Sequence, residues 1–144
     1  MKTLMITAAL ATALGGCASV SMGEPAQDAA RKQFTAPPPD KAAIYVYRNE
    51  MIGTAVKMDV SIDGQPIGQT VPKTYLYAEV SPGRHTITSS AENTDTVEVN
   101  LRPGALAYIW QEIKMGLLSA RNQLHVVSEP EGQRGVRESK LAVK

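Results

Sequence analysis

The fold of this chain is decided by the stretch VKMDVSIDGQPIGQ, residues 56–69. Over residues 56–62 apolar and polar side chains alternate, which is the pattern of a strand with one buried and one exposed face. Asp63 and Gly64 follow, and this pair favours a two-residue hairpin turn because both residue types tolerate positive φ. Pro66 lies in the return strand and has no amide hydrogen to donate. It therefore predicts that the return strand lies at a sheet edge.

Strand-like runs separated by turn residues continue on both sides of this hairpin. The further strands are expected at residues 44–48, 74–80, 84–89, 96–101, 105–114 and 124–127. The run 105–114 also places apolar residues at helical spacing, but its aromatic centre favours a strand that ends before Gly116. Ser128, Pro130 and Glu131 predict the start of a short helix. The sequence therefore predicts a mainly β chain, a single antiparallel β-sandwich of about seven strands with a short C-terminal helix or turn.

The amino-terminal residues have a different character. Lys2 is the only charged residue before Glu24, and an apolar segment of residues 4–14 follows it. This order is typical of a secretory signal peptide. A helix of that length, rising about 1.5 Å per residue, covers about half of a hydrocarbon core roughly 30 Å thick. The segment is therefore too short to span a membrane.

Cys17 is the only cysteine of the chain, and it directly follows Leu14, Gly15 and Gly16. This run resembles the lipobox of bacterial lipoproteins. The resemblance implies cleavage before Cys17, a diacylglyceryl group on its thiol and an acylated new amino terminus. It implies anchoring in the bacterial cell envelope through membrane lipid. Ala18 stands where some proteobacterial lipoproteins carry an inner-membrane retention aspartate, which favours the outer membrane, facing the periplasm.

The chain thus divides into a signal peptide of residues 1–16, a lipid-anchored linker of residues 17–40 and a sandwich domain of residues 41–144. The linker is rich in Ala and Pro, and its proline run favours an extended backbone. The residues after Pro25 could form two helical turns, which would be marginal in water on their own. A mostly mobile spacer that lifts the domain off the bilayer is expected. The basic C-terminal tail is expected to be solvated, with contact to anionic headgroups as the alternative.

Three segments of the domain carry a resemblance of their own. Residues 60–68 contain Ile-Asp-Gly before a further glycine, and residues 80–87 contain Pro-Gly-Arg-His. Residues 102–110 add Pro-Gly-Ala and an aromatic strand. Together they are similar to the PEGA-type β-sandwich and to an uncharacterised family of small bacterial lipoproteins, over about residues 42–141. The resemblance implies a prealbumin-like sandwich without established catalysis.

Composition and motif content exclude several classes of partner, site and activity. The chain has 15 basic and 14 acidic residues, a balance that argues against a nucleic-acid partner. One cysteine allows neither an intramolecular disulfide nor a cysteine-based zinc site. The only histidines, His85 and His125, are interpreted as structural, and no metal site or cofactor is expected. Because no nucleophile elbow or phosphate-binding loop occurs, the protein is expected not to be an enzyme.

Four tyrosines are the candidate contact residues. Tyr45 and Tyr47, like Tyr75 and Tyr77, are two residues apart and share one face of a strand. They form either a core layer with hydroxyls at its rim or a surface for a glycan strand or protein partner. The apolar residues of the loop 49–55 are expected to pack onto the core, with a protruding contact for a membrane or a partner as the alternative.

These patterns predict a non-catalytic envelope lipoprotein that presents its sandwich to an envelope protein or to peptidoglycan. The first alternative is a carrier of a lipid, a metal or a cell-wall fragment held between the sheets. A hydrolase that uses the two histidines is the second alternative.

Overall fold

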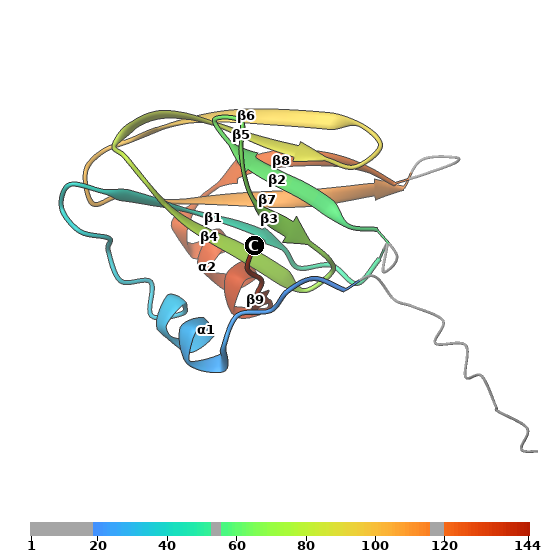
Figure 1. Ribbon diagram of the computed structural model, residues 1–144, viewed down its shortest axis with the longest axis horizontal. Helices are drawn as coiled ribbons and strands as arrows, with labels where there is room; N and C mark the ends of the chain where they lie inside the picture. The colour runs from blue at the N-terminus through green and yellow to red at the C-terminus, as the bar shows by residue number, and fades with distance from the viewer. Residues whose placement is uncertain (1–18, 53–55, 116–119) are drawn as a thin grey trace, which may run out of the picture.

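The computed structural model describes residues 19–52, 56–115 and 120–144 (Figure 1). The strands are β1 Ala42–Arg48, β2 Met58–Ile62, β3 Gln65–Thr70, β4 Thr74–Val80, β5 Gly83–Ser90, β6 Thr94–Leu101, β7 Leu106–Met115, β8 Ala120–Val127 and β9 Lys140–Leu141. The helices are α1 Pro25–Arg31 and α2 Glu129–Arg137. No helix in these ranges has the length and apolar character needed to cross a membrane.

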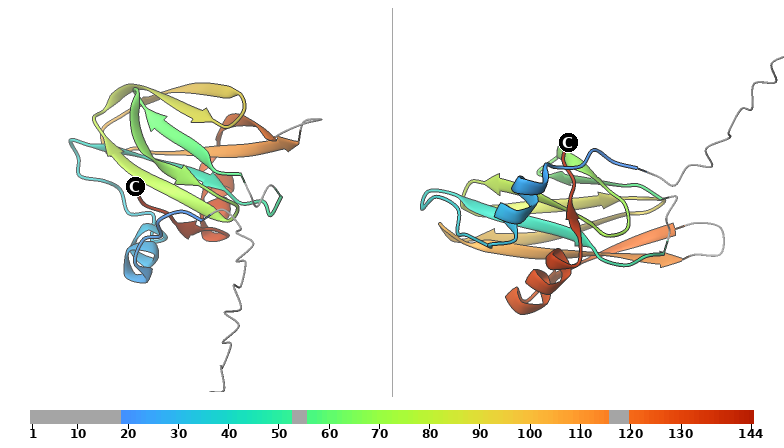
Figure 2. Two further views of the ribbon diagram at one scale, coloured as in Figure 1. Left: turned by 45° about the vertical axis from the view of Figure 1, so that its right-hand side comes forward. Right: turned by 90° about the horizontal axis from the view of Figure 1, so that it is seen from below.

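The strands form a β-sandwich, which confirms the predicted fold class. One sheet has the order β8-β7-β1-β4-β9 and the other has the order β3-β2-β5-β6. Both helices lie on the outer side of the five-stranded sheet, whereas neither helix covers the outer face of the four-stranded sheet (Figures 1 and 2). The predicted strand over 105–114 is present as β7, and the short C-terminal helix is present as α2.

The five-stranded sheet is mixed, and the prediction of purely antiparallel pairing is wrong for it. β1 pairs with β7 in parallel, and β4 pairs with β9 in parallel. Parallel neighbours need a long connection. The rhythm of strands and turns shows only the short connections, so it could not reveal pairs between strands that are distant in the sequence.

The hairpin that decides the fold forms as expected. Asp63 and Gly64 have φ of 50° and 79°, which is the backbone of a type I′ turn between β2 and β3. β3 lies at the edge of its sheet, in agreement with Pro66. The pairing shifts between Val60 and Ser61, where Ile67 of β3 is the extra residue of a bulge, while β2 keeps its alternation of buried and outward residues.

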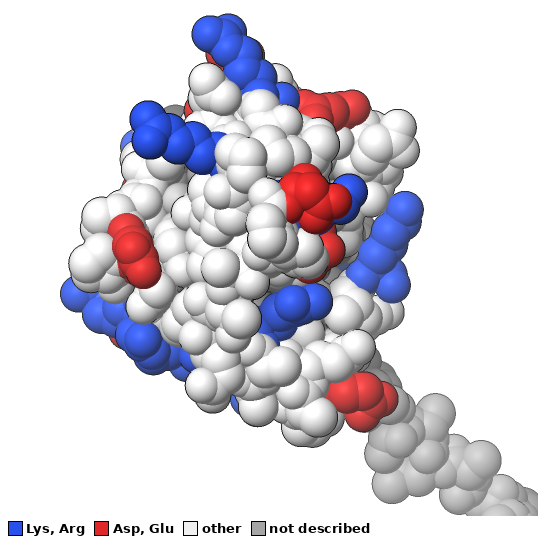
Figure 3. Space-filling model, turned by 90° about the vertical axis from the view of Figure 1, so that its left-hand side faces the viewer, with Lys and Arg blue, Asp and Glu red and all other residues white. Residues whose placement is uncertain are grey.

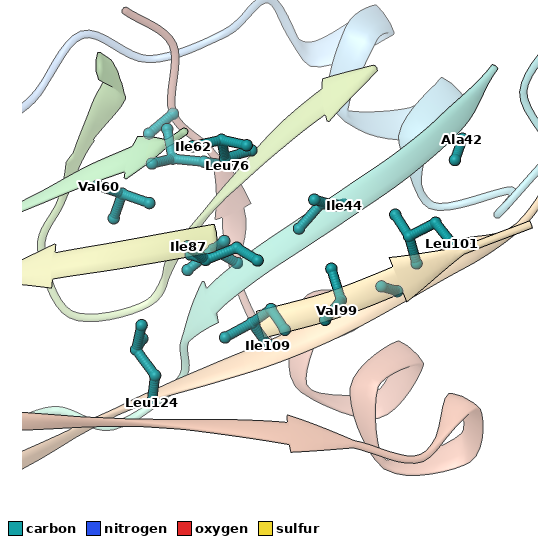
Figure 4. Packing of buried hydrophobic residues seen from close by; sticks show 13 residues of the cluster. Ala42, Ile44, Val60, Ile62, Leu76, Ile87, Val99, Leu101, Ile109 and Leu124 are labelled. Carbon is teal, nitrogen blue, oxygen red and sulfur yellow. The ribbon is translucent and has the colours of Figure 1, made fainter. Parts of the chain in front are cut away.

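β1 is the central strand of its sheet and is buried along its whole length. One face of β1 packs between the two sheets, against side chains from β2, β4, β5, β6, β7 and β8 (Figure 4). The other face packs beneath the helices. A strand buried on both faces explains the continuous apolar and aromatic run of its sequence.

Helix α1 packs against the sandwich, so the prediction of a mostly mobile spacer over residues 17–40 is wrong for the described part of that segment. The Tyr75 hydroxyl donates to the Asp28 carboxylate over 2.7 Å, and the Tyr45 hydroxyl donates to the Arg31 carbonyl over 2.8 Å. A helix of seven residues is marginal alone, but tertiary contacts of this kind stabilise it.

The chain before α1 pairs with the C-terminal segment. The amide of Gly23 donates to the carbonyl of Leu141 over 2.9 Å, and the amide of Val143 donates to that of Ser21 over 2.8 Å. The described N-terminal residues therefore extend the sheet at the β9 edge, and the two ends of the described chain lie against each other.

Helix α2 approaches the sheet through its glycines. An added Cβ at Gly132 would lie 2.2 Å from Tyr108, and one at Gly135 would lie 2.1 Å from the Tyr47 ring. Both glycines are buried. The two glycines lower the intrinsic helix propensity, yet they allow this close contact between helix and tyrosine rings.

Candidate functional site

The four tyrosines are brought together as the sequence predicts. Tyr45 pairs with Tyr77, and Tyr47 pairs with Tyr75 across β1 and β4. The exposed fractions of Tyr45, Tyr47 and Tyr75 are only 1%, 2% and 0%, because α1 and α2 cover them. The interpretation as a partner surface is therefore wrong for these three, and the alternative of a core layer holds.

The hydroxyls of Tyr45 and Tyr75 act as donors to α1. Burial raises the pKa of Tyr47 to about 12 and also raises the pKa values of Tyr45 and Tyr75, so all three stay protonated near neutral pH. Tyr77 is half-buried, and the guanidinium of Arg31 lies 3.7 Å from the centre of its ring. The tyrosine layer thus fixes α1 and is not free for a ligand.

His85 connects two turns of the sandwich. Its Nδ1 lies 2.5 Å from the Asp63 carboxylate, and its Nε2 lies 2.6 Å from the carbonyl oxygen of Ser81. Burial acts to lower the pKa of His85, but the hydrogen bonds to Asp63 and Ser81 outweigh it and raise the pKa above 6.5. Because both ring nitrogens face acceptors, the imidazole is a structural clamp between the two turns. Asp63 of the Ile-Asp-Gly motif and His85 of the Pro-Gly-x-His motif are thus hydrogen-bonded to each other.

His125 lies on β8 of the five-stranded sheet, whereas His85 lies on β5 of the four-stranded sheet. Its ring stacks on Trp110 with 4.9 Å between centroids, and its Nε2 lies 3.4 Å from a carboxylate oxygen of Glu112. Within residues 19–52, 56–115 and 120–144, no three His, Cys, Asp or Glu side chains are grouped so that they could hold a metal ion. The two histidines are on different sheets and are not brought together.

Arg48 is a structural residue that the sequence reasoning missed. Its side chain is fully buried and forms an ion pair with Glu50, with 2.5 Å between Nε and Oε1. Its Nη1 donates to the carbonyl of Val56 over 2.7 Å, and its Nη2 to that of Ile52 over 3.4 Å. A basic residue at the end of an otherwise apolar strand was the available signal. Arg48 holds both described ends of the loop after β1.

A row of hydrogen-bonded polar side chains links the two sheets near Arg48. Gln111 of β7 is fully buried; its Oε1 accepts from the Thr70 hydroxyl over 2.5 Å, and its Nε2 donates to Ser89 over 2.7 Å. All three groups are paired, which avoids the cost of an unsatisfied buried polar atom. This row of hydrogen bonds fixes the distance between the two sheets near Arg48.

Among the described residues, no helix covers the outer face of the four-stranded sheet. We define this polar face by its outward residues, which are small, hydroxylated or charged: Asp59, Ser61, Arg84, Thr86, Thr88, Ser90, Thr94, Thr96, Glu98 and Asn100. The register aligns Ser61, Thr88 and Thr96 in one row across three strands. Their side chains can each donate and accept hydrogen bonds.

A groove of about 460 Å³ adjoins the polar face. Asp59, Ser61 and Gln69 line it on the side of the sheet, and Val20 and Val143 line it on the side of the chain ends. Basic and acidic groups are interspersed on the end of the molecule seen in Figure 3, with no continuous field of one sign there. The polar face with its groove is the candidate contact surface.

The loop after β1 exposes two large apolar residues. The exposed fractions are 63% for Met51 and 51% for Ile52. The prediction that this loop packs its apolar residues onto the core is wrong for these two, whose side chains protrude from the fold. Residues 53–55 of the predicted loop lie outside the described residues.

The predicted lipidation residue, Cys17, lies outside the described residues, as do Leu14, Gly15 and Gly16 of the cleavage motif. The basic residues of the predicted tail are exposed: Arg134, Arg137, Lys140 and Lys144. The guanidinium of Arg137 also lies 5.1 Å from the ring centre of Phe34.

Comparisons with known proteins found a family model and a relative that match much of the chain. The model of the family "Protein of unknown function (DUF2846)" matches residues 38–123. An "Uncharacterized protein" of Haemophilus influenzae is 32% identical over 136 residues, which cover 93% of this chain and 80% of that protein. No solved structure matches the chain. The expectation of an uncharacterised family is confirmed.

Proposed function

The chain belongs to the DUF2846 family, and on that premise we propose that it is a non-catalytic lipoprotein of the bacterial cell envelope. A lipid on Cys17 anchors it, and the polar face of a PEGA-like sandwich is presented to an envelope protein or to peptidoglycan. The observation that carries the proposal is the run Leu14-Gly15-Gly16-Cys17 directly after the apolar segment. In a Gram-negative host the anchor lies in the outer membrane and the domain faces the periplasm.

The arrangement of the described residues supports a role in presentation. The five-stranded sheet is covered by α1 and α2, whereas the four-stranded sheet carries rows of hydrogen-bonding side chains and no helix. His85 is bound at both nitrogens, and His125 is stacked on Trp110. Both nitrogens of His85 thus face acceptors, a carboxylate and a backbone carbonyl, and not the hydroxyl that a hydrolytic base would have to activate.

Membrane fractionation tests the anchor. The wild-type protein is expected to sediment with membranes, and Cys17→Ser is expected to leave it in the soluble fraction or as an uncleaved precursor. The physical reason is that two or three acyl chains hold a protein firmly, at about 0.8 kcal/mol per buried methylene. Equal sedimentation of the two forms would contradict the anchor.

Cross-linking in intact cells tests the presented face. Thr96→Arg places a long cation in the central row of the polar face and is expected to reduce the yield of the cross-linked partner several-fold. Thr35→Arg is the matched control, because Thr35 is exposed on the opposite side, between α1 and β1. Equal loss with both variants, or no loss with either, would contradict the polar face as the contact surface.

A small-ligand carrier is the second candidate, and the groove favours it. Its volume of about 460 Å³ lies within the range of small-molecule sites. The space between the sheets holds a cluster of thirteen buried apolar side chains, so we place such a ligand in the groove and not between the sheets. Native mass spectrometry of gently purified protein would reveal a bound molecule, and bare protein from several preparations would remove this candidate.

A further inference from the structure

We propose that one end of the sandwich, where β1 and β7 finish, rests directly on the phospholipid bilayer. Met51, Ile52 and Met115 define this membrane-facing end and reach into the headgroup region. The inference rests on the proposed function, because it takes Cys17 as the lipid anchor. It goes further by fixing how the domain is oriented and which residues touch lipid.

The three apolar side chains lie at the same end of the fold. β1 and β7 run parallel, so the loop after Arg48 and the end of β7 project in the same direction. Met51, Ile52 and Met115 are 63%, 51% and 63% exposed, whereas Val126, which is 53% exposed, pairs with Ile109 nearer the start of β7. The Arg48 guanidinium binds the carbonyl of Ile52, which holds the loop at this end. Exposed large apolar side chains grouped at one end of a small domain indicate a contact surface.

The anchor leaves little distance between this domain and the membrane. Ser21 is already hydrogen-bonded to Val143 of the C-terminal segment. The peptide steps from Cys17 to Ser21 can span at most about 14 Å. A lipid on Cys17 therefore holds the sandwich close against the headgroups instead of on a spacer of more than twenty residues.

The point where the described chain begins selects which end faces the bilayer. Val20 lines the groove, which extends along β2 from Asp59 and Ser90 to the turn at Gly64. Asp59 and Ser90 in turn line a hollow with Lys57 and Ala120, the first residue of β8. In Figures 1 and 2 the chain enters the fold on the side where β7 ends and β8 begins. The anchor and the exposed apolar residues thus share one side.

Basic residues surround the apolar ones. Lys57 is exposed just before β2, and Lys114 pairs in register with Arg121, next to Met115. Apolar side chains that alternate with Lys and Arg are the composition of surfaces that lie on anionic bilayers.

The acidic groups of this end are partly engaged within the protein. Glu50 is ion-paired with Arg48, and Glu138 accepts from the side-chain amide Nδ2 of Asn49 over 2.9 Å. Glu112 lies 3.6 Å from Lys114. Asp59 and Glu92 are also exposed at this end, where they line a hollow with Lys57, and Asp59 accepts from the side-chain amide of Gln69 over 2.8 Å. The exposed basic groups that can face an anionic headgroup are Lys57, Lys114 and Arg121.

The test uses the acylated full mature protein in vesicles of phosphatidylethanolamine and phosphatidylglycerol. Acylation occupies the thiol of the sole native cysteine, so an introduced cysteine is the only free thiol. Ile52→Cys and Met115→Cys place an environment-sensitive fluorophore at the membrane-facing end. Arg102→Cys is the control, since it is exposed in the turn before β7, whose first residues pair with the start of β1 at the opposite end.

We expect lipid-bound nitroxide to quench the labels at positions 52 and 115 at least three-fold more than the label at 102, and aqueous iodide to show the reverse order. The fluorescence of Trp110 serves as the check that each variant is folded. Equal quenching at all three positions, in protein that co-sediments with vesicles, would overturn the orientation and leave the anchor intact. Protein with an unmodified Cys17 that fails to co-sediment would overturn the proposed function, and this inference with it.

Discussion

At the scale of single residues, buried polar side chains determine how the two sheets meet. Arg48 ties the loop after β1 to the body, Gln111 bridges the sheets, and His85 joins the β2–β3 turn to the turn before β5. Each of these groups has its partners within the protein. Their loss is therefore expected to be costly, because the remaining partner groups would be left unsatisfied.

The pH dependence of stability tests the His85 clamp. The pKa of folded His85 is raised above 6.5, so its contribution to stability is fully present below pH 6.5 and is lost as the pH rises through the raised value. His85→Gln cannot titrate and is expected to remove this slope. Urea unfolding between pH 6 and pH 9 measures it, and parallel curves for the wild type and the variant would contradict the clamp.

Replacing Arg48 tests the buried ion pair. Arg48→Met leaves Glu50 and three carbonyl oxygens without their donor, and we expect it to lower the free energy of unfolding by about 3 kcal/mol. Arg102→Met, at an exposed turn, is expected to change it by less than about 0.5 kcal/mol. Chemical denaturation gives both values. A loss below about 1 kcal/mol for Arg48→Met would show that the pair is not structural.

At the scale of elements, the two helices are held by the tyrosine layer of the five-stranded sheet. The order of strands and turns, the Asp63-Gly64 hairpin and the edge position of β3 could be predicted from local patterns, because each depends on neighbours in the sequence. The parallel pairs and the position of α1 could not, since they depend on contacts between distant segments. Asp28, for example, is joined to Tyr75 and to the amide of Leu141.

Removing the charge of Asp28 tests how α1 is held. Burial acts to raise the pKa of Asp28, but the hydrogen bond from Tyr75 and the neighbouring Lys32 lower it. Its contribution is therefore present above pH 3.8 and is lost as the pH falls through the lowered value. Asp28→Asn is expected to cost about 1 kcal/mol at neutral pH and to speed amide exchange in α1 but not in β1. Unchanged exchange in α1 would contradict this role.

A glycine-to-alanine change tests the contact between α2 and β1. Alanine favours a helix by about 1 kcal/mol over glycine, but a Cβ at position 135 would collide with the Tyr47 ring. Gly135→Ala is therefore expected to destabilise the protein by about 1–3 kcal/mol. Arg134→Ala, on the exposed side of α2, is expected to be nearly neutral. Thermal unfolding would decide, and a stabilised Gly135→Ala variant would contradict the packing.

At the scale of the whole molecule, the sandwich has one covered face, one open polar face and one end with exposed apolar residues. The sequence leaves open whether the tyrosines form a core layer or a contact surface, because burial cannot be read from spacing alone, and the helices that cover them come from segments far apart in the chain. The polar face of the four-stranded sheet was visible only as alternating small residues. Its exposure depends on which sheet the helices cover, and both helices lie on the five-stranded sheet.

The intact mass of the mature protein, purified in detergent from its native membranes, tests the central proposal most directly. We predict a chain that begins at Cys17 and is heavier than its polypeptide by a diacylglyceryl group and one further acyl chain, with both located on the first residue by fragmentation. A mature chain with a free thiol at Cys17, or one that retains residues 1–16, would contradict the account.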